Sequence, residues 1–402
     1  MKMLHLEPSP SAGSNGLSSL RVSIVMPCLN EADTLERCIA KAQRALQEEK
    51  ILGEIVIADN GSTDGSTVIA RRMGARVVQV DAKGYGNALM GGIGAAQGEF
   101  IIMGDADDSY DFGEIAKFID KLQEGYDLVQ GCRLPSGGGR VLPGAMPSLH
   151  RWWGNPMFSF MVRHMFWAPI HDVYCGLRGF RKELYRRLDL RSTGMEFATE
   201  MIIKSHLFGA KMAEVPITLH RDGRKSHAPH LKTFRDGWRT LRFFLIYCPR
   251  WLFLIPGKLL VLLGLLGYAL ALPAVSIGGV TFDAHTLLFA SLAMLLGCQS
   301  IVFAIFAKLF AIGEGLLPED SRITRFSNLI NLERGLMIGA GAFLIGAVLL
   351  LVSLDQWRAS DFGHLDYART MRWVIPGVTL TALGLQTVLA SFFISLLGMR
   401  KR

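Results

Sequence analysis

Cysteine is scarce in this sequence, and its few copies are scattered. The 402 residues include six cysteines, with no Cys-x-x-Cys pair and no spacing that suits a metal site. This pattern argues against a disulfide framework and a cysteine-bound zinc ion, and it indicates reduced, mostly buried thiols. We therefore expect the N-terminal half of the chain, which carries most of the charge, to lie in the cytoplasm. The six are Cys28, Cys38, Cys132, Cys175, Cys248 and Cys298.

Two nucleotide-binding signatures are missing as well. No GxxxxGK(S/T) string occurs, which excludes a P-loop kinase, and no GxGxxG follows the first expected strand, which argues against a dinucleotide-binding fold. Residues 1–20 are rich in Ser and Gly and lack the basic start and apolar core of a signal peptide. For these residues we predict a disordered tail.

Basic residues outnumber acidic ones, 43 to 35, which gives a net charge of +8. Many basic side chains fall between Arg221 and Arg250, directly before the first long apolar run. This placement favours anionic lipid over nucleic acid as the partner. Residues 228–250 also repeat apolar side chains at helical spacing, surrounded by Lys and Arg. We predict an amphipathic helix among the lipid headgroups; the alternative is a helix packed on a soluble domain.

Long apolar segments fill the C-terminal part of the chain. Each approaches or exceeds the roughly 20 residues that a helix needs to cross a bilayer, so we predict an all-α transmembrane domain of four helices. The loop 276–284 has no Lys or Arg, whereas basic residues gather on the other side, which puts both termini in the cytoplasm. Arg358, Arg369 and Arg372 in the loop 355–373 break this pattern. The segments are 257–275, 286–307, 335–354 and 374–398.

The N-terminal half alternates short β-rich runs with helical patterns, which implies βαβ units and a mainly parallel sheet covered by helices on both faces. The predicted strands are 22–28, 54–59, 75–80, 99–105 and 127–132, and helical patterns cover 32–47 and 114–122. The resulting domains are a tail at 1–20, an α/β domain at 21–227, an interface helix at 228–250 and the transmembrane domain at 251–402.

Polar residues cluster where the predicted strands end, which is where ligands collect in such sheets. The first, second and fourth strands lead into 27–31, 59–65 and 104–108. The third leads into the Gly-rich turn 83–87, where a helix N-terminus beside Lys83 suits a phosphate. Tight packing of the following helix on the sheet explains its glycines more simply.

Asp105 and Asp107 follow the fourth strand as an Asp-Ala-Asp turn. Two neighbouring carboxylates repel each other unless a cation lies between them, and Mg²⁺ or Mn²⁺ suits such a pair when substrate phosphates complete its coordination. A nucleotide diphosphate would supply those phosphates, and the metal would neutralise it on departure. The alternative is a solvated turn or helix cap, a role that we assign to Asp111 before Phe112.

Taken together, these motifs resemble the family 2 glycosyltransferases, and among them the polyprenyl-phosphate (dolichyl-phosphate) mannose and glucose synthases. The resemblance spans about residues 20 to 245 and implies a GT-A, Rossmann-like catalytic domain. It is carried by VMPCLNEADTL, IVIADNGSTDGS, GYGNALMGGIGAAQGE, GDADDSYD, CGLRGF at 175–180 and GMEFATEM at 194–201.

The resemblance also implies a set of site residues, in which Asn60 stands where the family often has a second Asp, and Asn155 where it often has Ser. Asp105, Asp107, Arg133 and Arg151 would be catalytic. The nucleotide sugar would contact Pro27, Glu31, Asp59, Asp105, Arg221 and Lys225; the metal, Asp105 and Asp107; and the acceptor phosphate, Arg133, Arg151 and Asn155.

The implied reaction moves a hexose, with inversion, from a UDP- or GDP-hexose to a polyprenyl phosphate at the cytoplasmic face. An ionised lipid phosphate needs no general base. A hydroxyl acceptor would need one, for which Glu196, Glu200 and Asp172 are candidates. A processive polysaccharide synthase is disfavoured because Ser148 stands where its Gln-x-x-Arg-Trp motif has Gln. A translocation role for the transmembrane domain and a homo-oligomer stay open, and nucleic acid is not an expected partner.

Overall fold

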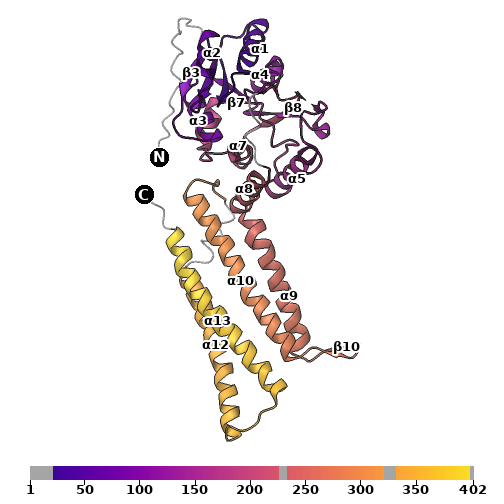
Figure 1. Cartoon of the computed structure of the whole chain (residues 1–402). Coiled ribbons are helices and arrows are strands. Elements are labelled where there is room, and N and C mark those ends of the chain that lie inside the picture. Colours follow the sequence, from indigo (N-terminus) through magenta and orange to yellow (C-terminus); the bar gives the residue numbers. More distant parts are fainter. Residues whose placement is uncertain (1–20, 226–232, 321–331, 399–402) are drawn as a thin grey trace, which may run out of the picture. The chain divides into compact units, whose positions relative to one another are not determined.

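The computed structural model describes residues 21–225, 233–320 and 332–398 (Figure 1). The predicted tail therefore lies outside the described residues, as does the first part of the predicted interface helix. The chain divides into two compact units. The first holds the residues up to Arg163 and Trp167–Thr233, and the second holds His164–Phe166 and the residues from Phe234 onward.

The first unit is built on a seven-stranded sheet with the order β3-β2-β1-β4-β7-β5-β8. Neighbouring strands are parallel except at β7, which runs antiparallel to both β4 and β5. The mainly parallel sheet and its five predicted strands are confirmed, whereas β7 and β8 were not predicted. The strands are β1 (Val22–Cys28), β2 (Gly53–Asp59), β3 (Arg76–Gln79), β4 (Phe100–Met103), β5 (Leu128–Cys132), β7 (Arg178–Arg181) and β8 (Met212–Pro216).

Helices cover both faces of this sheet. Alternate residues of a strand point to opposite sides, so the apolar strands present side chains on both faces that have to be buried. Ile24 and Met26 of β1 join the core cluster that contains the buried stripe of α1, including Leu35 and Ile39. Val25 points to the other face. The helices are α1 (Leu35–Glu48), α2 (Ser66–Arg72), α3 (Tyr85–Ala95), η1 (Phe112–Ile115), α4 (Ala116–Gln123), α5 (Asn155–Phe166), α6 (Lys182–Leu188) and α7 (Glu196–Leu207).

The glycines of α3 let this helix approach the sheet closely. A Cβ at Gly92 would lie 2.7 Å from a methyl group of Val25 and 2.9 Å from the Cβ of Ala58. The packing explanation for the Gly-rich helix is therefore confirmed at this position. Short elements complete the unit: η2 (Pro135–Gly137), β6 (Arg140–Val141), the π-helical turn η3 (His150–Gly154) and β9 (Thr218–Leu219).

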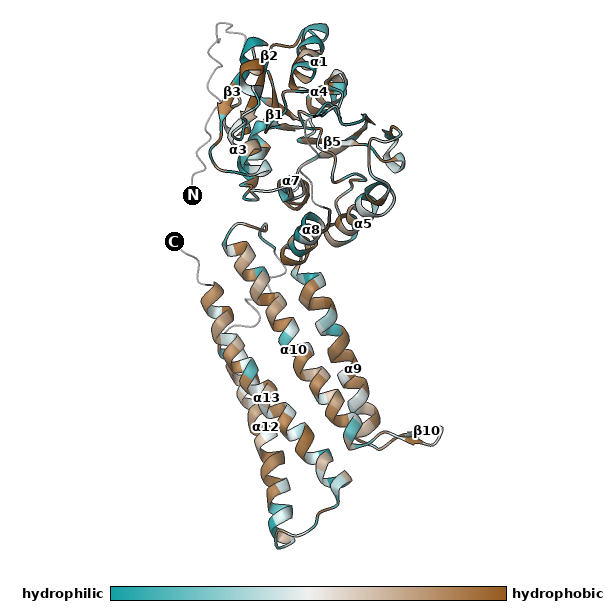
Figure 2. Cartoon of the chain, in the orientation of Figure 1, coloured by the Kyte–Doolittle hydropathy of each residue, from teal (hydrophilic) through white to brown (hydrophobic). Residues whose placement is uncertain are grey.

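The second unit contains four helices that are long and apolar enough to cross a membrane, so the chain is an integral membrane protein (Figure 2). Each begins before its predicted apolar segment, but the first ends four residues earlier than predicted, at Ala271, and the fourth ends as predicted; they cover Arg250–Ala271, Ala284–Gly313, Leu332–Ala359 and Tyr367–Gly398. The elements are α8 (Thr233–Tyr247), η4 (Arg250–Leu254), α9 (Ile255–Ala271), the hairpin strands β10 (Ser276–Ile277) and β11 (Val280–Thr281), α10 (Ala284–Gly313), α12 (Leu332–Ala359) and α13 (Tyr367–Gly398).

Small residues and hydroxyl groups join the membrane helices, as is usual where no hydrophobic effect drives association. On α12, a Cβ at Gly339 would lie 2.8 Å from the carbonyl oxygen of Gly384 in α13. Tyr268 of α9 shares hydrogen bonds of 2.6 Å with Ser291 of α10 and 2.9 Å with Thr379 of α13. These contacts tie three of the helices together at one level.

Candidate active site

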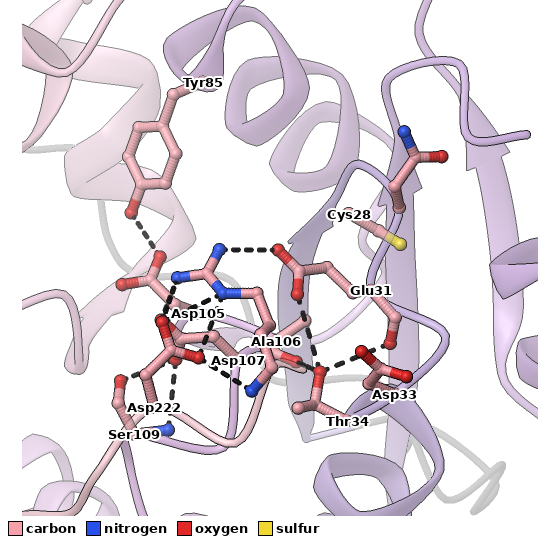
Figure 3. A network of polar contacts seen from close by, with 12 residues as sticks. Cys28, Glu31, Asp33, Thr34, Tyr85, Asp105, Ala106, Asp107, Ser109 and Asp222 are labelled. Atoms are coloured by element: carbon pink, nitrogen blue, oxygen red, sulfur yellow. Dashed lines mark hydrogen bonds and ion pairs between the residues drawn. The ribbon is translucent and has the colours of Figure 1, made fainter. Parts of the chain in front are cut away.

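The candidate site lies at the carboxyl ends of β1, β2 and β4, where the predicted polar loops meet (Figure 3). Thr34, in the loop after β1, donates a hydrogen bond of 2.6 Å to the carbonyl oxygen of Ala106, in the loop after β4. A third segment, residues 222–225, contacts both loops. The amide of Gly223 donates to the carbonyl oxygen of Asp107 at 2.9 Å, and that of Lys225 to Asp33 at 2.9 Å.

Asp105 accepts a hydrogen bond of 2.8 Å from the hydroxyl group of Tyr85, at the start of α3 (Figure 3). Burial of the Asp105 carboxyl, together with the nearby charge of Asp107, raises its pKa to about 6. Its second oxygen lies where the backbone after Cys175 passes, because a Cβ at Gly176 would come within 2.5 Å of it. Glycine in the CGLRGF motif therefore leaves room for this carboxylate.

Asp107 and Asp108 have separate partners. One oxygen of Asp107 accepts from the amide and hydroxyl groups of Ser109, at 3.0 and 2.6 Å. Asp108 has a positive φ of 63°, and its carboxylate pairs with Lys41 of α1 at 2.9 Å. Because of this sharp turn, the side chain of Asp107 lies in the site, whereas that of Asp108 contacts α1. At the next turn, Asp111 accepts from the amide of Gly113, so the predicted helix cap is confirmed.

Arg224 is a site residue that the sequence reasoning missed. Its guanidinium group contacts three carboxylates, with distances of 3.1 Å to Glu31, 3.1 Å to Asp107 and 2.7 Å to Asp222. Only 9% of its side chain is exposed. The string Arg-Asp-Gly-Arg-Lys offers three cations within five positions, and nothing in it separates Arg224 from its neighbours.

The two basic residues predicted for the donor phosphates have other described contacts. The Nε atom of Arg221 donates to the carbonyl oxygen of Pro143 at 2.6 Å. Arg221 also lines a cavity of about 430 Å³ together with Lys41 and Asp108. Lys225 makes its described contact through the backbone amide. Of this basic run, Arg224 is the residue that bonds Asp107 in the described part of the chain.

The predicted nucleoside residues lie at the ends of the first two strands. Asp59 is 1% exposed and accepts from the amides of Gly61 and Ser62 at 3.1 and 3.2 Å, which shapes the loop after β2. Pro27 lies opposite Ala58 in the register of β1 and β2.

Asn60 acts on the neighbouring loop. Its side-chain amide donates to the carbonyl oxygens of Val80 and Ala82, both at 2.8 Å, and its side-chain oxygen accepts from the amide of Gly84 at 2.9 Å. The amide of Asn60 therefore orders the Gly-rich turn before α3, a task that requires both a donor and an acceptor. An aspartate at this position would offer acceptors only.

Arg133 forms a buried, bidentate ion pair with Asp172. The Nε and Nη2 atoms lie 2.7 and 2.9 Å from the carboxylate oxygens, and the backbone amide of Arg133 donates to the same group at 2.9 Å. The Nη1 atom is 3.4 Å from the hydroxyl oxygen of Tyr110. Glu214 of β8 in turn accepts from the amides of His171 and Asp172, which fixes the carboxylate that holds Arg133.

Arg151 and Asn155 lie at η3 and the start of α5, and no described contact joins them to Arg133. The guanidinium carbon of Arg151 lies 5.3 Å from the centre of the Trp152 ring, and the amide nitrogen of Asn155 is 3.2 Å from the sulfur of Met146. Burial and the charge of Arg133 lower the pKa of His150, so η3 lies within electrostatic range of Arg133.

Glu200 is fully buried and pairs with Lys204 at 2.9 Å. Its carboxylate also accepts from the amides of Arg191 and Ser192, at 3.1 and 2.8 Å. The carbonyl oxygen of the next residue, Thr193, accepts from the amide of Gly86 in α3. Glu200 thus holds a loop beside the Gly-rich turn, whereas Glu196, the first residue of α7, is half-buried.

Asp105 and Asp107 fit a divalent cation that also binds a phosphate-bearing substrate. The described residues contain no group of three or more His, Cys, Asp or Glu side chains that could hold a metal ion by itself. Mg²⁺ commonly takes only one or two carboxylates and completes its shell with substrate phosphates and water. Burial and the nearby charge of Asp107 raise the pKa of Asp105, so a cation beside the two carboxylates would favour the ionised form of Asp105.

Comparisons with known proteins identify the family of the chain. Residues 23–189 match glycosyl transferase family 2, and residues 305–398 match the glycosyltransferase family 2 C-terminal transmembrane region. A low-salt glycan biosynthesis hexosyltransferase, Agl6, from Haloferax volcanii is 37% identical over 94% of this chain and 89% of its own length. The chain belongs to glycosyltransferase family 2, and is an enzyme whose catalytic domain is built on a mainly parallel, Rossmann-like sheet.

Two further relatives match shorter parts of the chain. A dolichyl-phosphate hexose transferase from Haloferax volcanii is 32% identical over 49% of this chain and 81% of its own length. An undecaprenyl-phosphate 4-deoxy-4-formamido-L-arabinose transferase from Pseudomonas syringae is 29% identical over 70% of this chain and 82% of its own length. The names of both relatives include a polyprenyl phosphate.

Proposed function

We propose that this chain transfers a hexose from a UDP- or GDP-hexose to a polyprenyl phosphate at the cytoplasmic face of the membrane, with inversion at the anomeric carbon. The observation that carries this proposal is the carboxylate pair Asp105 and Asp107 at the carboxyl edge of the sheet, in a chain with four membrane-spanning helices. The names of the dolichyl-phosphate and undecaprenyl-phosphate relatives support the choice of acceptor.

On the donor side, Pro27, Glu31 and Asp59 bind the nucleoside, and Asp105 and Asp107 hold Mg²⁺ or Mn²⁺. When bound, the metal supplies positive charge for the diphosphate that leaves. Arg221 and Lys225 are the predicted phosphate contacts beside it. Tyr85 orients Asp105 through its hydrogen bond, and Gly176 leaves space for the carboxylate.

On the acceptor side, an oxygen of the lipid phosphate forms the new bond to the anomeric carbon, and the bond to the donor diphosphate breaks. No proton has to move, because the phosphate is already ionised. Arg133, Arg151 and Asn155 position this phosphate. Charge-assisted contacts from two guanidinium groups contribute about 1.5–3 kcal/mol each.

The contacts of two candidate general bases, Asp172 and Glu200, favour a phosphate acceptor over a hydroxyl acceptor. Asp172 binds Arg133 with both oxygens, and Glu200 is fully buried against Lys204 and two backbone amides. Neither carboxylate is placed to accept a proton from an incoming hydroxyl group. An apolar acceptor also suits the unusual exposure of aromatic side chains around η3 and α5, where Trp153 is 73% and Phe160 is 58% exposed.

For the membrane unit we propose that α8 lies among the lipid headgroups and that both termini are cytoplasmic. Phe234 and Trp238 of α8 are exposed apolar side chains beside exposed Arg235. Arg372, which breaks the positive-inside pattern, pairs with Asp283 at 2.8 Å, so its charge is compensated there. In intact cells, an impermeant thiol reagent should label Ser276→Cys on the hairpin but not the parent protein. If Ser276→Cys were labelled only after the cells are lysed, the hairpin would be cytoplasmic and the proposed orientation would be wrong.

The test of the reaction uses purified full-length protein with Mg²⁺ or Mn²⁺, a panel of radiolabelled UDP- and GDP-hexoses, and a polyprenyl phosphate. We expect label to enter the organic phase with one donor, and Asp107→Ala to abolish the transfer. Lys117→Ala, which removes an exposed ion pair with Glu114, is the matched control. Binding of nucleotide without any lipid label would contradict the phosphate acceptor and favour a hydroxyl acceptor.

A further inference from the structure

The guanidinium group of Arg224 binds a carboxylate that the proposed reaction needs for its metal ion. Its guanidinium group bonds Asp107, one of the two metal-binding carboxylates, and Glu31, a predicted donor contact. In addition, Asp222 binds the Nε and Nη2 atoms of the same group, at 3.0 and 2.7 Å. The side chain is almost fully buried within this ring of three carboxylates.

Electrostatics make Arg224 a strong counter-ion. An arginine is always charged in proteins, so the carboxylates are partly neutralised before any ligand arrives. A single guanidinium group faces three carboxylates, so it cannot neutralise all of them.

Among the described residues, three hydrogen bonds attach the segment that carries Arg224 to the site loops and α1, besides the ion pairs of Arg224 itself. The amides of Gly223 and Lys225 bond Asp107 and Asp33, and Arg37 donates to the carbonyl oxygen of Gly223 at 3.4 Å. These bonds all involve the backbone of the segment, so a swing of the Arg224 side chain breaks its own ion pairs and leaves these bonds intact.

We propose that Arg224 is a donor-binding residue with two states: the counter-ion of Glu31 and Asp107 in the empty site, and a ligand of the donor diphosphate in the loaded one. The proposal rests on the proposed function. A metal ion and Arg224 compete for the charge of Asp107, and the planar guanidinium group suits bidentate contact with phosphate oxygens. When the metal binds Asp107, the donor diphosphate becomes the new partner of Arg224.

This exchange couples the two ligands. Metal alone has to take Asp107 from Arg224 and leaves it only Glu31 and Asp222, with no new anion in exchange, so it binds weakly. Metal and nucleotide together satisfy every charge, so each strengthens the binding of the other. A purely structural role, in which Arg224 only clamps the loops, predicts no such coupling.

Two variants of Arg224 separate these roles. Arg224→Gln removes the charge, so Mn²⁺ alone should bind about tenfold more tightly, while UDP or GDP at saturating Mn²⁺ should bind about tenfold more weakly. Arg224→Lys keeps the charge but loses the planar fork, so Mn²⁺ alone should bind about as it does to the parent protein while the nucleotide binds more weakly. Arg72→Gln, which removes an exposed cation paired with Glu36, is the control for net charge.

The measurement is electron paramagnetic resonance of free Mn²⁺, titrated into the purified full-length protein with and without UDP or GDP. Thermal unfolding of each variant verifies its fold, and Arg224→Lys carries the test if Arg224→Gln fails to fold. Unchanged or weaker binding of Mn²⁺ alone to Arg224→Gln, or unchanged nucleotide binding to Arg224→Lys, would overturn the exchange. If the parent protein bound neither nucleotide with Mn²⁺, the proposed function would fail first.

Discussion

Removal of the carboxylate of Asp172 should destabilise the catalytic unit strongly. Asp172 is fully buried and accepts three hydrogen bonds from Arg133, whose side chain is only 8% exposed. Breaking a buried ion pair on one side costs about 3–5 kcal/mol, because the other charge stays buried without a partner. For a unit of about 200 residues, each kcal/mol shifts the melting temperature by roughly 2–4 °C, so Asp172→Ala should melt roughly 6–20 °C lower.

The assay is thermal unfolding of the full-length protein in detergent, combined with a double replacement. When Arg133→Met and Asp172→Leu are made together, apolar packing replaces both charges, and most of the lost stability should return. Transfer to the polyprenyl phosphate should not return, because Arg133 is a proposed acceptor contact. A loss of less than about 1 kcal/mol in Asp172→Ala, or no recovery in the double variant, would refute this account of the pair.

Three further substitutions test the site and the membrane unit. Tyr85→Phe removes the hydrogen bond to Asp105 and should weaken Mn²⁺ binding in the presence of nucleotide by about tenfold, measured by electron paramagnetic resonance. Gly176→Ala places a methyl group 2.5 Å from Asp105 and should lower turnover at least tenfold with unchanged circular dichroism. Gly339→Leu should lower the melting temperature by separating α12 from α13, whereas Gly341→Leu, with open space around it, should not.

The sequence was sufficient for the features that depend on local pattern. Alternating apolar runs predicted five strands, and the Asp-Ala-Asp turn after the fourth predicted the carboxylate pair. The four membrane helices were also predicted, although all four begin earlier than their apolar segments and two end later. Helices often extend past the hydrocarbon core, so apolar length alone marks the centre of a span better than its ends.

Features that depend on distant partners were not visible. β7 is only four residues long, Arg178–Arg181, and it enters the sheet between β4 and β5, which no local pattern announces. Asp172 meets Arg133 across 39 positions of the chain. Arg224 was passed over for Arg221 and Lys225 because the choice among three neighbouring cations depends on which one faces Glu31 and Asp107.

The direction of β7 makes the residues between β5 and β7 a separate insertion at one edge of the sheet. Because β7 is antiparallel, Arg178 lies opposite both Met103 of β4 and Gln130 of β5, so the chain leaves and re-enters the sheet at the same edge. The segment between β5 and β7 contains Arg151, Asn155 and α5. The Arg133–Asp172 ion pair joins the two ends of this segment. The segment with the residues proposed for the acceptor can therefore be lengthened or replaced without a change in the strands that hold the residues proposed for the donor.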